Sequence, residues 1–282
     1  MLSSEFNKNI QKVLVSYKKN AGEAYETANL IPGLLKKYGV ESVVRPSMDI
    51  TRADTDGVGL VIVCGGDGTL LITFGMIFPL EVPIIGLNFG KLGFLVDIPD
   101  YSKEEVINAF FDGSLDFTSR MALDIYINRK GETISKFVAL NEATIAREKS
   151  IRARVIDLTV YVDEMWLNDF RADGLIVSTP TGSTAYSLSA GGPIVQPDIE
   201  SFILTPICPH TLTNRPVILN PCELRIKIAP QERDIFMSAD GREGVALMDF
   251  DEIIIKKHPS KVYLAASFSL NYWDILRSKL KW

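Results

Sequence analysis

The sequence predicts two domains, an α/β domain on a parallel sheet followed by a β-rich domain. In the first part of the chain, buried apolar strand segments alternate with helical segments, which is typical of a parallel sheet covered by helices. From about Arg120 to Ser267 the segments are mostly short and alternate apolar with polar residues, which is typical of half-buried strands. We expect the α/β domain over residues 1–118, completed by 268–282, and the β-rich domain over residues 119–267.

The elements of the first domain follow from apolar runs and from helix boundary signals. A helix is expected over Glu23–Tyr38, with Gly39 as its stop and Pro32 as a kink or early end. A second helix is expected over Ser102–Phe111, where Ser102 and Glu105 have the spacing of a capping box. The expected strands are Lys12–Tyr17, Val43–Arg45, Leu60–Cys64 and Val82–Leu87.

The second domain is expected to consist of short strands separated by Gly, Pro and Asn. The clearest strands are Ala122–Ile127, Lys136–Leu140, Ile156–Val162, Leu224–Ile228 and Glu252–Lys256. The tail Asn271–Trp282 has an amphipathic helical pattern and is long enough to pack on the first domain.

Composition excludes several classes of protein. The chain has 282 residues, 46% of them hydrophobic and 23% charged, which is typical of a globular protein. The net charge of −5 argues against binding nucleic acid, which needs a basic face. No apolar run approaches the roughly 20 residues that span a bilayer, so no membrane partner is expected. With two histidines in the chain, catalysis by a histidine pair is nearly excluded.

The cysteines and the N-terminus indicate a location in the cytoplasm. Cys64, Cys208 and Cys222 are widely spaced and form no CxxC pair, so structural zinc is not expected. An odd number of cysteines fits a reducing compartment. The first residues, MLSSEFNKNIQKVLVSY, lack the layout of a secretory signal.

The turn Gly65–Thr69, which reads GGDGT, is the most informative motif. It follows the buried strand Leu60–Cys64 and precedes the helix-like segment Leu70–Phe74. Glycines let backbone N–H groups approach a ligand, and ligands of α/β sheets bind at the carboxyl ends of strands. Because a carboxylate repels phosphate, Asp67 needs a role such as accepting a proton or holding a metal ion. The alternative is an ordinary turn with Asp67 on the surface.

A stretch rich in glycine and hydroxyl groups runs over Arg171–Pro193. Between Ser178 and Ser189, seven of twelve residues are Ser or Thr, and Tyr186 adds a phenol. Such a stretch can surround a polar ligand with neutral donors and acceptors. The alternative is a cluster of turns in which the hydroxyls cap helices.

Three shorter motifs are weak when taken alone. Asn141-Glu142 follows an expected strand, and these residue types can bind an adenine edge and ribose hydroxyls. The loop Pro206–Pro216 is stiffened by three prolines, and its His210 is interpreted as a loop residue. Ser238–Arg242 is interpreted as a β-turn with Asp240-Gly241 at its centre.

Taken together and in this order, these motifs resemble the NAD kinase family from about Val58 to Arg242, including LGF at Leu92–Phe94. The resemblance implies a Rossmann-like α/β N-terminal domain and a β-sandwich-like C-terminal domain, with the last segment returning to the first. It implies transfer of a phosphoryl group from ATP, or from polyphosphate, to the adenosine ribose 2′-hydroxyl of NAD. Mg²⁺ or another divalent cation would accompany ATP, and the protein would be a homodimer or homotetramer.

The resemblance also assigns site residues. Asp67 would be the catalytic general base, and no protein metal ligands are expected. The phosphate-binding residues would be Gly65, Gly66, Gly68 and Thr69. The NAD-binding residues would be Asp67, Gly68, Leu71, Phe94, Asn141, Glu142, Arg171, Asp173, Thr184, Ala185, Tyr186, Ser187, Leu188 and Ser189. Many bacterial relatives carry Gln where this chain has Arg242, so the role of Arg242 is left open.

Two other functions stay open at this point. A lipid kinase could share the GGDGT turn, although an acidic chain without a basic amphipathic helix disfavours it. A non-catalytic NAD-binding sensor could use the same scaffold, although the intact Asp67 argues against a decayed site.

Overall fold

A mostly parallel sheet organises the N-terminal part of the chain in the computed structural model, which describes residues 6–7, 10–90, 92–147, 155–211, 213–230, 234–268 and 270–282. The chain divides into unit 1, residues 1–119 with 261–282, and unit 2, residues 120–260. The fold class is the expected one, an α/β unit followed by a β-rich unit.

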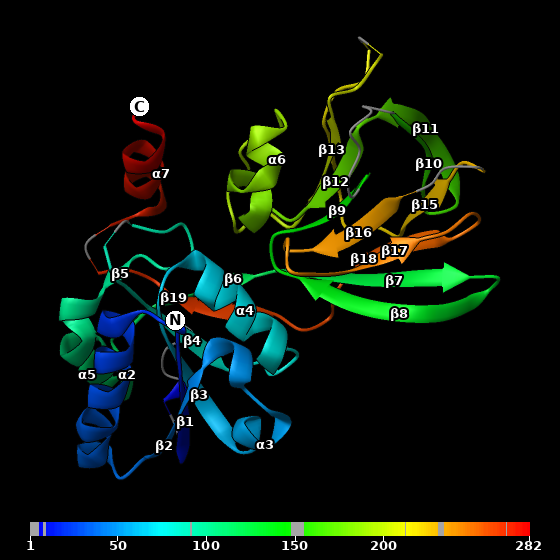
Figure 1. Ribbon diagram of the computed structural model, residues 1–282. Coiled ribbons are helices and arrows are strands. Elements are labelled where there is room, and N and C mark those ends of the chain that lie inside the picture. The colour runs from blue at the N-terminus through cyan, green and yellow to red at the C-terminus, as the bar shows by residue number, and fades with distance from the viewer. Residues whose placement is uncertain are drawn as a thin grey trace. The chain divides into compact units, whose positions relative to one another are not determined.

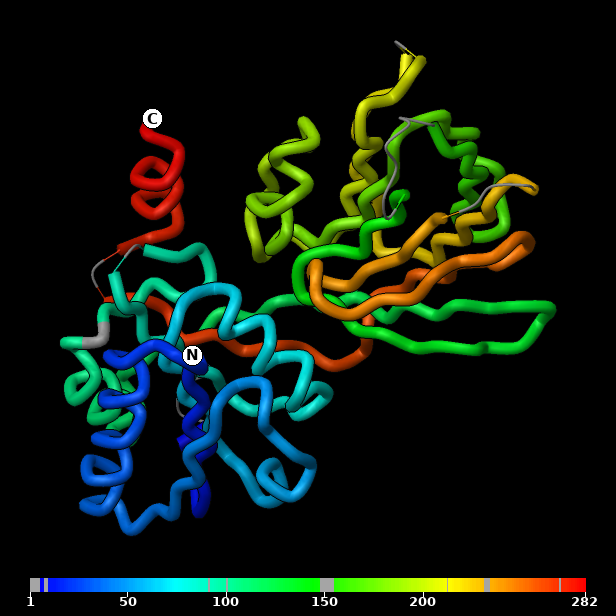
Figure 2. Tube along the Cα trace, viewed as in Figure 1, coloured from blue at the N-terminus to red at the C-terminus, as the bar shows by residue number. Residues whose placement is uncertain are grey.

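The sheet of unit 1 has the strand order β2-β1-β3-β4-β19-β6, with β5 paired to β4. The pairs β1–β2, β1–β3, β3–β4, β4–β5 and β4–β19 are parallel. Its strands are β1 (Lys12–Tyr17), β2 (Glu41–Pro46), β3 (Val58–Cys64), β4 (Pro83–Asn88), β5 (Ile98–Pro99), β6 (Phe117–Arg120) and β19 (Val262–Ala265). The tube in Figure 2 shows the C-terminal segment, in red, returning to this unit. Residues 261–267, which we expected in the β-rich domain, belong here because β19 pairs with β4.

Helices of unit 1 bury apolar side chains against this sheet. The α-helices are α2 (Gly22–Leu35), α3 (Arg52–Thr55), α4 (Asp67–Ile77), α5 (Lys103–Asp112) and α7 (Tyr272–Leu280). The 3₁₀ turns are Lys36–Tyr38, Ser47–Asp49 and Asp100–Ser102. Ala28 and Ile31 of α2 share one core with Leu60 and Ile62 of β3. The predicted helix over Glu23–Tyr38 is therefore α2 with one 3₁₀ turn, and Gly39, at φ 68°, ends it.

The capping box expected at Ser102 and Glu105 is wrong. The helix α5 is present, but Ser102 makes no side-chain cap hydrogen bond. A 3₁₀ turn leads directly into α5, so Ser102 has φ −84° and ψ 6° instead of the extended conformation of an N-cap.

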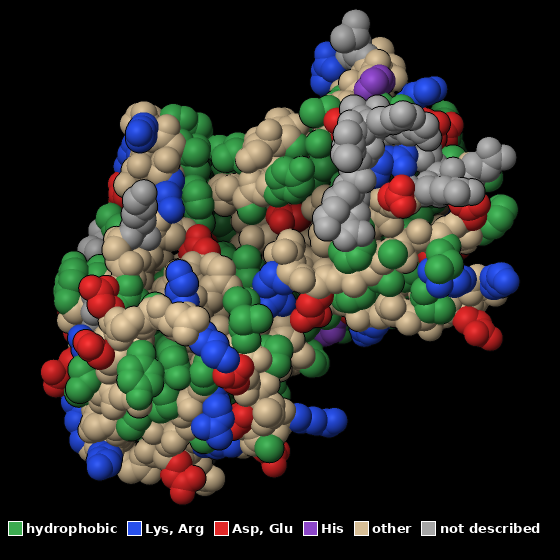
Figure 3. Space-filling model, viewed as in Figure 1, with side chains coloured by type: hydrophobic (Ala, Val, Ile, Leu, Met, Phe, Trp, Pro, Cys, Tyr) green, Lys and Arg blue, Asp and Glu red, His purple; other side chains and the backbone are tan. Residues whose placement is uncertain are grey.

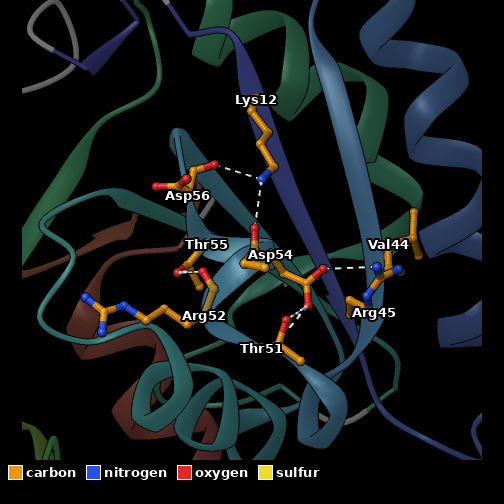
Figure 4. A network of polar contacts seen from close by, with 9 residues as sticks. Lys12, Val44, Arg45, Thr51, Arg52, Asp54, Thr55 and Asp56 are labelled. Carbon is orange, nitrogen blue, oxygen red and sulfur yellow. Dashed lines mark hydrogen bonds and ion pairs between the residues drawn. The ribbon is translucent and has the colours of Figure 1, made fainter.

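A capping box does form at α3, inside a polar network beside β1 and β2 (Figure 4). Asp54 Oδ2 accepts hydrogen bonds from the N–H and the hydroxyl of Thr51, at 2.9 and 2.7 Å. Asp54 Oδ1 pairs with Arg45 at 3.0 Å. The bonds from Thr51 and the charge of Arg45 lower the pKa of Asp54.

Unit 2 consists of two antiparallel sheets that share one apolar core. Their strand orders are β11-β10-β15-β18-β7-β8 and β14-β13-β12-β9-β16-β17. Ile125 and Leu158 of the first sheet and Ile145 and Leu175 of the second belong to the same buried cluster, as in a sandwich. The strands are β7 (Leu123–Arg129), β8 (Glu132–Ala139), β9 (Glu142–Arg147), β10 (Ile156–Val162), β11 (Met165–Ala172), β12 (Gly174–Ser178), β13 (Phe202–Ile207), β14 (Val217–Leu219), β15 (Leu224–Ile228), β16 (Ile235–Ala239), β17 (Glu243–Leu247) and β18 (Glu252–Lys257). The 3₁₀ turn Thr181–Thr184 and the short helix α6 (Tyr186–Ser189) follow β12.

Two surface observations complete the fold. In the space-filling view of Figure 3, acidic and basic side chains are interspersed over the face that is drawn. Within the described part of the chain, no helix combines the length and the apolar character that crossing a membrane requires.

Candidate functional site

The predicted site residues are divided between the two units. In unit 1, β3 ends at Cys64 and α4 begins at Asp67, so Gly65 and Gly66 make the whole connection. Gly66 is the N-cap, and its carbonyl accepts the N–H groups of Thr69 and Leu70 at 2.9 and 3.1 Å. This geometry leaves the first N–H groups of α4 facing outward from the start of the helix, where they favour an anion.

The carboxylate of Asp67 is held by three backbone amides of a later loop. Oδ2 accepts the N–H of Phe94 at 2.8 Å, and Oδ1 accepts those of Leu95 and Val96 at 3.1 and 3.0 Å. A Cβ on Gly93 would overlap Asp67 Oδ1, so only glycine lets the loop approach this closely. We call these five residues the Asp67 cluster.

The Asp67 carboxylate keeps some capacity for a further contact. A carboxylate has about four lone-pair positions, of which the amides take three, so one remains on Oδ2. The side chain of Asp67 is half-buried. Its position is therefore fixed by hydrogen bonds while one oxygen can still accept a proton.

The other predicted residues of unit 1 differ in accessibility. Gly68 is exposed, and Leu71 and Phe94 are half-buried. The ring of Phe94 lies 5.5 Å from the ammonium of Lys279 on α7, which is a cation–π contact. Thr69 is buried and packs so closely on Gly65 that a Cβ there would overlap its side chain. The Thr69 side chain is thus part of the packing that shapes the turn.

In unit 2, the segment Leu140–Glu142 is held by the buried carboxylate of Asp240. Oδ2 accepts the N–H of Leu140 at 2.9 Å, and Oδ1 accepts those of Asn141 and Glu142 at 2.7 and 3.1 Å. Asp240 is 8% exposed and has φ 51°, which few residues other than glycine adopt. We call these four residues the Asp240 cluster.

Beside this segment lie buried polar atoms without a hydrogen-bond partner among the described residues. They are Asn141 Oδ1, Glu142 Oε2 and Thr181 Oγ1, in side chains that are 8%, 6% and 5% exposed. Unpaired buried polar atoms are costly, so these three are candidates for contact with a polar ligand or with water.

Burial and, to a smaller extent, the charge of Asp240 together raise the pKa of Glu142 to about 8, against one hydrogen bond from the backbone N–H of Tyr186. This bond connects Glu142 to α6, within the hydroxyl-rich stretch.

Most hydroxyls of that stretch are bonded within the protein. Ser178 donates to Asn141 O, and Thr179 donates to Leu140 O. Ser183 exchanges hydrogen bonds with the backbone of Val195. Ser187 is fully buried and bonds Thr205 Oγ1 at 2.9 Å, which leaves its side chain inside the fold.

The groups of this stretch that stay accessible lie toward α6. Tyr186 is 45% exposed, and Ser189 is exposed as well. Thr184, Ala185 and Leu188 are half-buried. Polar contacts with a ligand would thus come from a few positions, while the rest of the motif builds the turn.

Arg171 lies near the end of β11, and Asp173 directly follows this strand. Arg171 is exposed, with its Nε 3.9 Å from Asp157 Oδ1. Asp173 is half-buried, and its N–H donates to Ile207 O.

Arg242 follows the Asp240 turn, and its guanidinium lies 3.9 Å from Glu243. Of the Pro206–Pro216 loop, Leu212 lies outside the described residues, and His210 is exposed.

The amide contacts of both clusters were not predicted from the sequence. Asp240 was expected in a simple turn, but its carboxylate also bonds amides about a hundred positions away. The one available signal was an Asp-Gly pair directly after a strand, and that signal indicates a turn but not its contacts.

Sequence comparisons link both units to a known family. Residues 7–115 match the ATP-NAD kinase N-terminal domain, and residues 140–267 match the ATP-NAD kinase C-terminal domain. An NAD kinase of Treponema denticola is 39% identical over 277 residues, covering 97% of both chains. An NAD kinase of Magnetococcus marinus is 38% identical over 283 residues, covering 100% of this chain and 87% of its own.

Solved structures agree with the sequence relatives. A yeast NADH kinase complexed with NADH superimposes with a TM-score of 0.87 at 25% identity, covering 98% of this chain and 89% of that one. An Archaeoglobus fulgidus NAD kinase in complex with ATP has a TM-score of 0.77 at 25% identity, covering 96% and 99%.

Proposed function

The chain belongs to the NAD kinase family, and from this premise we propose how its residues carry out the reaction. It is an NAD kinase, which transfers a phosphoryl group to NAD. Relatives of this name, at about 40% identity, favour NAD kinase activity over the lipid kinase considered above. We propose that the γ-phosphoryl of ATP is transferred to the adenosine ribose 2′-hydroxyl, forming NADP. The Archaeoglobus neighbour in complex with ATP supports this donor.

Asp67 is the proposed general base, and the observation that supports it is the geometry of its carboxylate. Three amides fix its orientation and leave one lone pair on Oδ2 to accept the hydroxyl proton. The transition state of phosphoryl transfer is loose, so the proton can leave late and a strong base is not required. Such assistance is typically worth about 10²–10⁴-fold in rate.

Phosphate groups are proposed to bind at the start of α4. Gly65, Gly66 and Gly68 bring backbone close to the ligand, and the helix N-terminus favours negative charge. Because Thr69 is buried and its N–H bonds the carbonyl of Gly66, its proposed contribution to phosphate binding is the shape of the turn.

A divalent cation is proposed to arrive with ATP. Among the side chains that the structure describes, no group of three or more His, Cys, Asp or Glu could hold a metal ion. We therefore propose that Mg²⁺ is bound mainly by phosphate oxygens and water. Bound there, Mg²⁺ would neutralise charge on the phosphates.

The NAD contacts proposed for unit 2 are the Asn141-Glu142 pair and the accessible groups near α6. The unpaired Asn141 Oδ1 and Glu142 Oε2 support this, since the adenine amino group and the ribose hydroxyls of NAD could donate hydrogen bonds to them. Arg171 and Asp173 are proposed to contact the nicotinamide half, including that of a neighbouring subunit in a homodimer or homotetramer.

The reducing cytoplasm is the proposed location of the protein, supported by three free cysteines.

One assay tests the proposal. The purified protein is incubated with NAD and Mg-ATP, and NADP is detected with an NADP-specific dehydrogenase. We expect NADP to form, and a parallel series with polyphosphate then determines the range of donors. Binding of NAD without formation of NADP would instead support a sensor, and labelled lipid would support a lipid kinase.

A further inference from the structure

The proposed reaction leaves the buried carboxylate of Asp240 without a role. We propose that Asp240 is a positioning residue for NAD binding, which fixes Leu140–Glu142 so that the side chains of Asn141 and Glu142 are presented to NAD. The inference rests on the proposed function, because it takes Asn141 and Glu142 as NAD contacts.

Among the described residues, Asp240 is the acceptor for the amide side of the segment. All three N–H groups of Leu140–Glu142 donate to its carboxylate, at 2.7 to 3.1 Å. The segment lies just before β9, where Glu142 is the first residue to enter the sheet. An amide side chain cannot replace this acceptor, since Asn offers one carbonyl oxygen and adds two donors that would face N–H groups.

The carbonyl side of the same segment is bonded as well. Leu140 O accepts the hydroxyl of Thr179 at 2.6 Å, and Asn141 O accepts the N–H of Thr179 at 2.8 Å. Glu142 O accepts the N–H of Asp240 at 2.9 Å. With every backbone group bonded, the segment is rigid, whereas Asn141 Oδ1 and Glu142 Oε2 stay unpaired among the described residues. The backbone is therefore fixed in advance and the side-chain oxygens are left for a ligand.

Asp240 also contributes, after burial, to the raised pKa of Glu142. Two buried carboxyl groups in proximity do not both ionise easily. Burial raises the pKa of Asp240, while its three amide bonds and the guanidinium of Arg242 oppose that rise. Burial raises the pKa of Glu142, the charge of Asp240 raises it as well, and the N–H of Tyr186 opposes the rise. The three amide bonds and Arg242 therefore favour the charged form of Asp240, whereas burial and the charge of Asp240 favour the protonated form of Glu142.

Asp240→Asn tests the inference, with NAD dissociation constants and steady-state rates measured on the full chain. We expect the dissociation constant and KM for NAD to rise at least about tenfold, because at least one of the three buried amides loses its acceptor and faces an N–H donor instead. The kcat at saturating NAD should stay within about threefold, since Asp240 touches no reacting atom. The pH at which NAD affinity changes should also move to lower values, because the charge beside Glu142 is gone.

Asp251→Asn is the matched control. Asp251 is a fully buried carboxylate of unit 2 that accepts the N–H of Met248 and pairs with Arg129 at 2.8 Å. Its loss should lower stability and leave NAD affinity and its pH dependence unchanged. Wild-type NAD affinity in Asp240→Asn, or an equal loss of affinity in both variants, overturns the inference.

Hydrogen exchange on the wild-type chain covers the case in which Asp240→Asn does not fold. The amides of Asn141 and Glu142 should be strongly protected without NAD and change little when NAD binds. Fast exchange that slows only with NAD would show that the segment is not fixed in advance, which contradicts the inference. Absence of NADP formation by the wild type would instead refute the proposed function, so the two failures are distinguishable.

Discussion

The Asp67 and Asp240 clusters use the same arrangement in different surroundings. In each, one carboxylate accepts three successive backbone N–H groups, from Phe94–Val96 in unit 1 and from Leu140–Glu142 in unit 2. Asp67 is half-buried, whereas Asp240 is 8% exposed. Asp67 begins a helix at the end of a buried strand, whereas Asp240 lies in a turn between two strands.

We propose that this difference separates a reacting carboxylate, Asp67, from a supporting one, Asp240. At Asp67, the amides of Phe94–Val96 orient a carboxylate that is half-buried and therefore still accessible to a substrate. At Asp240 the carboxylate is enclosed, and the groups left unpaired belong to the segment that it holds. The same three-amide contact can thus serve chemistry in one unit and binding in the other.

The largest expected effect is that of Asp67→Asn. Removing the proposed base should lower kcat by about 10²–10⁴-fold, while the NAD dissociation constant changes little. The rate of NADP formation and calorimetric titration with NAD check this. Wild-type turnover in the variant would refute the assignment of Asp67.

Gly93→Ala should reduce turnover although it leaves the Asp67 side chain itself unchanged. The new Cβ would overlap Asp67 Oδ1, so the carboxylate or the loop must move. A displacement of about 1 Å can cost about 10²-fold in rate. Gly33→Ala on α2, where a Cβ meets open space, is the control and should keep its full rate. Equal rates in both variants would show that the contact between Gly93 and Asp67 is not important for catalysis.

Gly182→Ala is the corresponding change in unit 2. Its Cβ would overlap the carbonyl of Asn141, so it strains the segment that Asp240 holds. We expect NAD affinity to fall about tenfold with kcat nearly kept. Steady-state kinetics over a range of NAD concentrations distinguish the two parameters, and a variant that loses kcat alone would be inconsistent with a binding role for this segment.

The smallest expected effect concerns pH and stability. The pKa of Glu142 is raised to about 8 by burial and by the charge of Asp240, against about 4.3 in an unfolded chain. Between these values the folded state keeps a proton that the unfolded state releases, so stability falls as pH rises through that window. Glu142→Gln removes the group, so its Tm should fall less between about pH 5 and about pH 8 than that of the wild type. Parallel Tm curves would show that Glu142 does not titrate in this way.

The sequence predicted the elements whose signals are local. β1, β10 and β15 have the expected bounds, because alternating or continuous apolar residues show in the sequence which side chains are buried. The capping box at Ser102 failed because a 3₁₀ turn changed the backbone entering α5. The segment Val262–Ala265 was expected in the β-rich domain, but as β19 it pairs with β4 of unit 1. The residues of a strand do not indicate which strand it pairs with.

The site was predictable in its residue types and not in its contacts. The glycines around Asp67 and the hydroxyl-rich stretch are visible in the sequence, and their order indicated the family. The amides that hold Asp67 and Asp240 come from backbone 27 to 29 and 98 to 100 positions away, and backbone groups carry no sequence signal. The buried hydroxyls of Ser183 and Ser187 likewise cannot be told from accessible ones before the fold is known.

The division of roles is tested most directly by measuring kcat and the NAD dissociation constant side by side for Asp67→Asn and Asp240→Asn. We predict that Asp67→Asn loses turnover and keeps NAD affinity, and that Asp240→Asn loses NAD affinity and keeps turnover at saturation. The reverse pattern, or the same loss in both variants, would contradict the division.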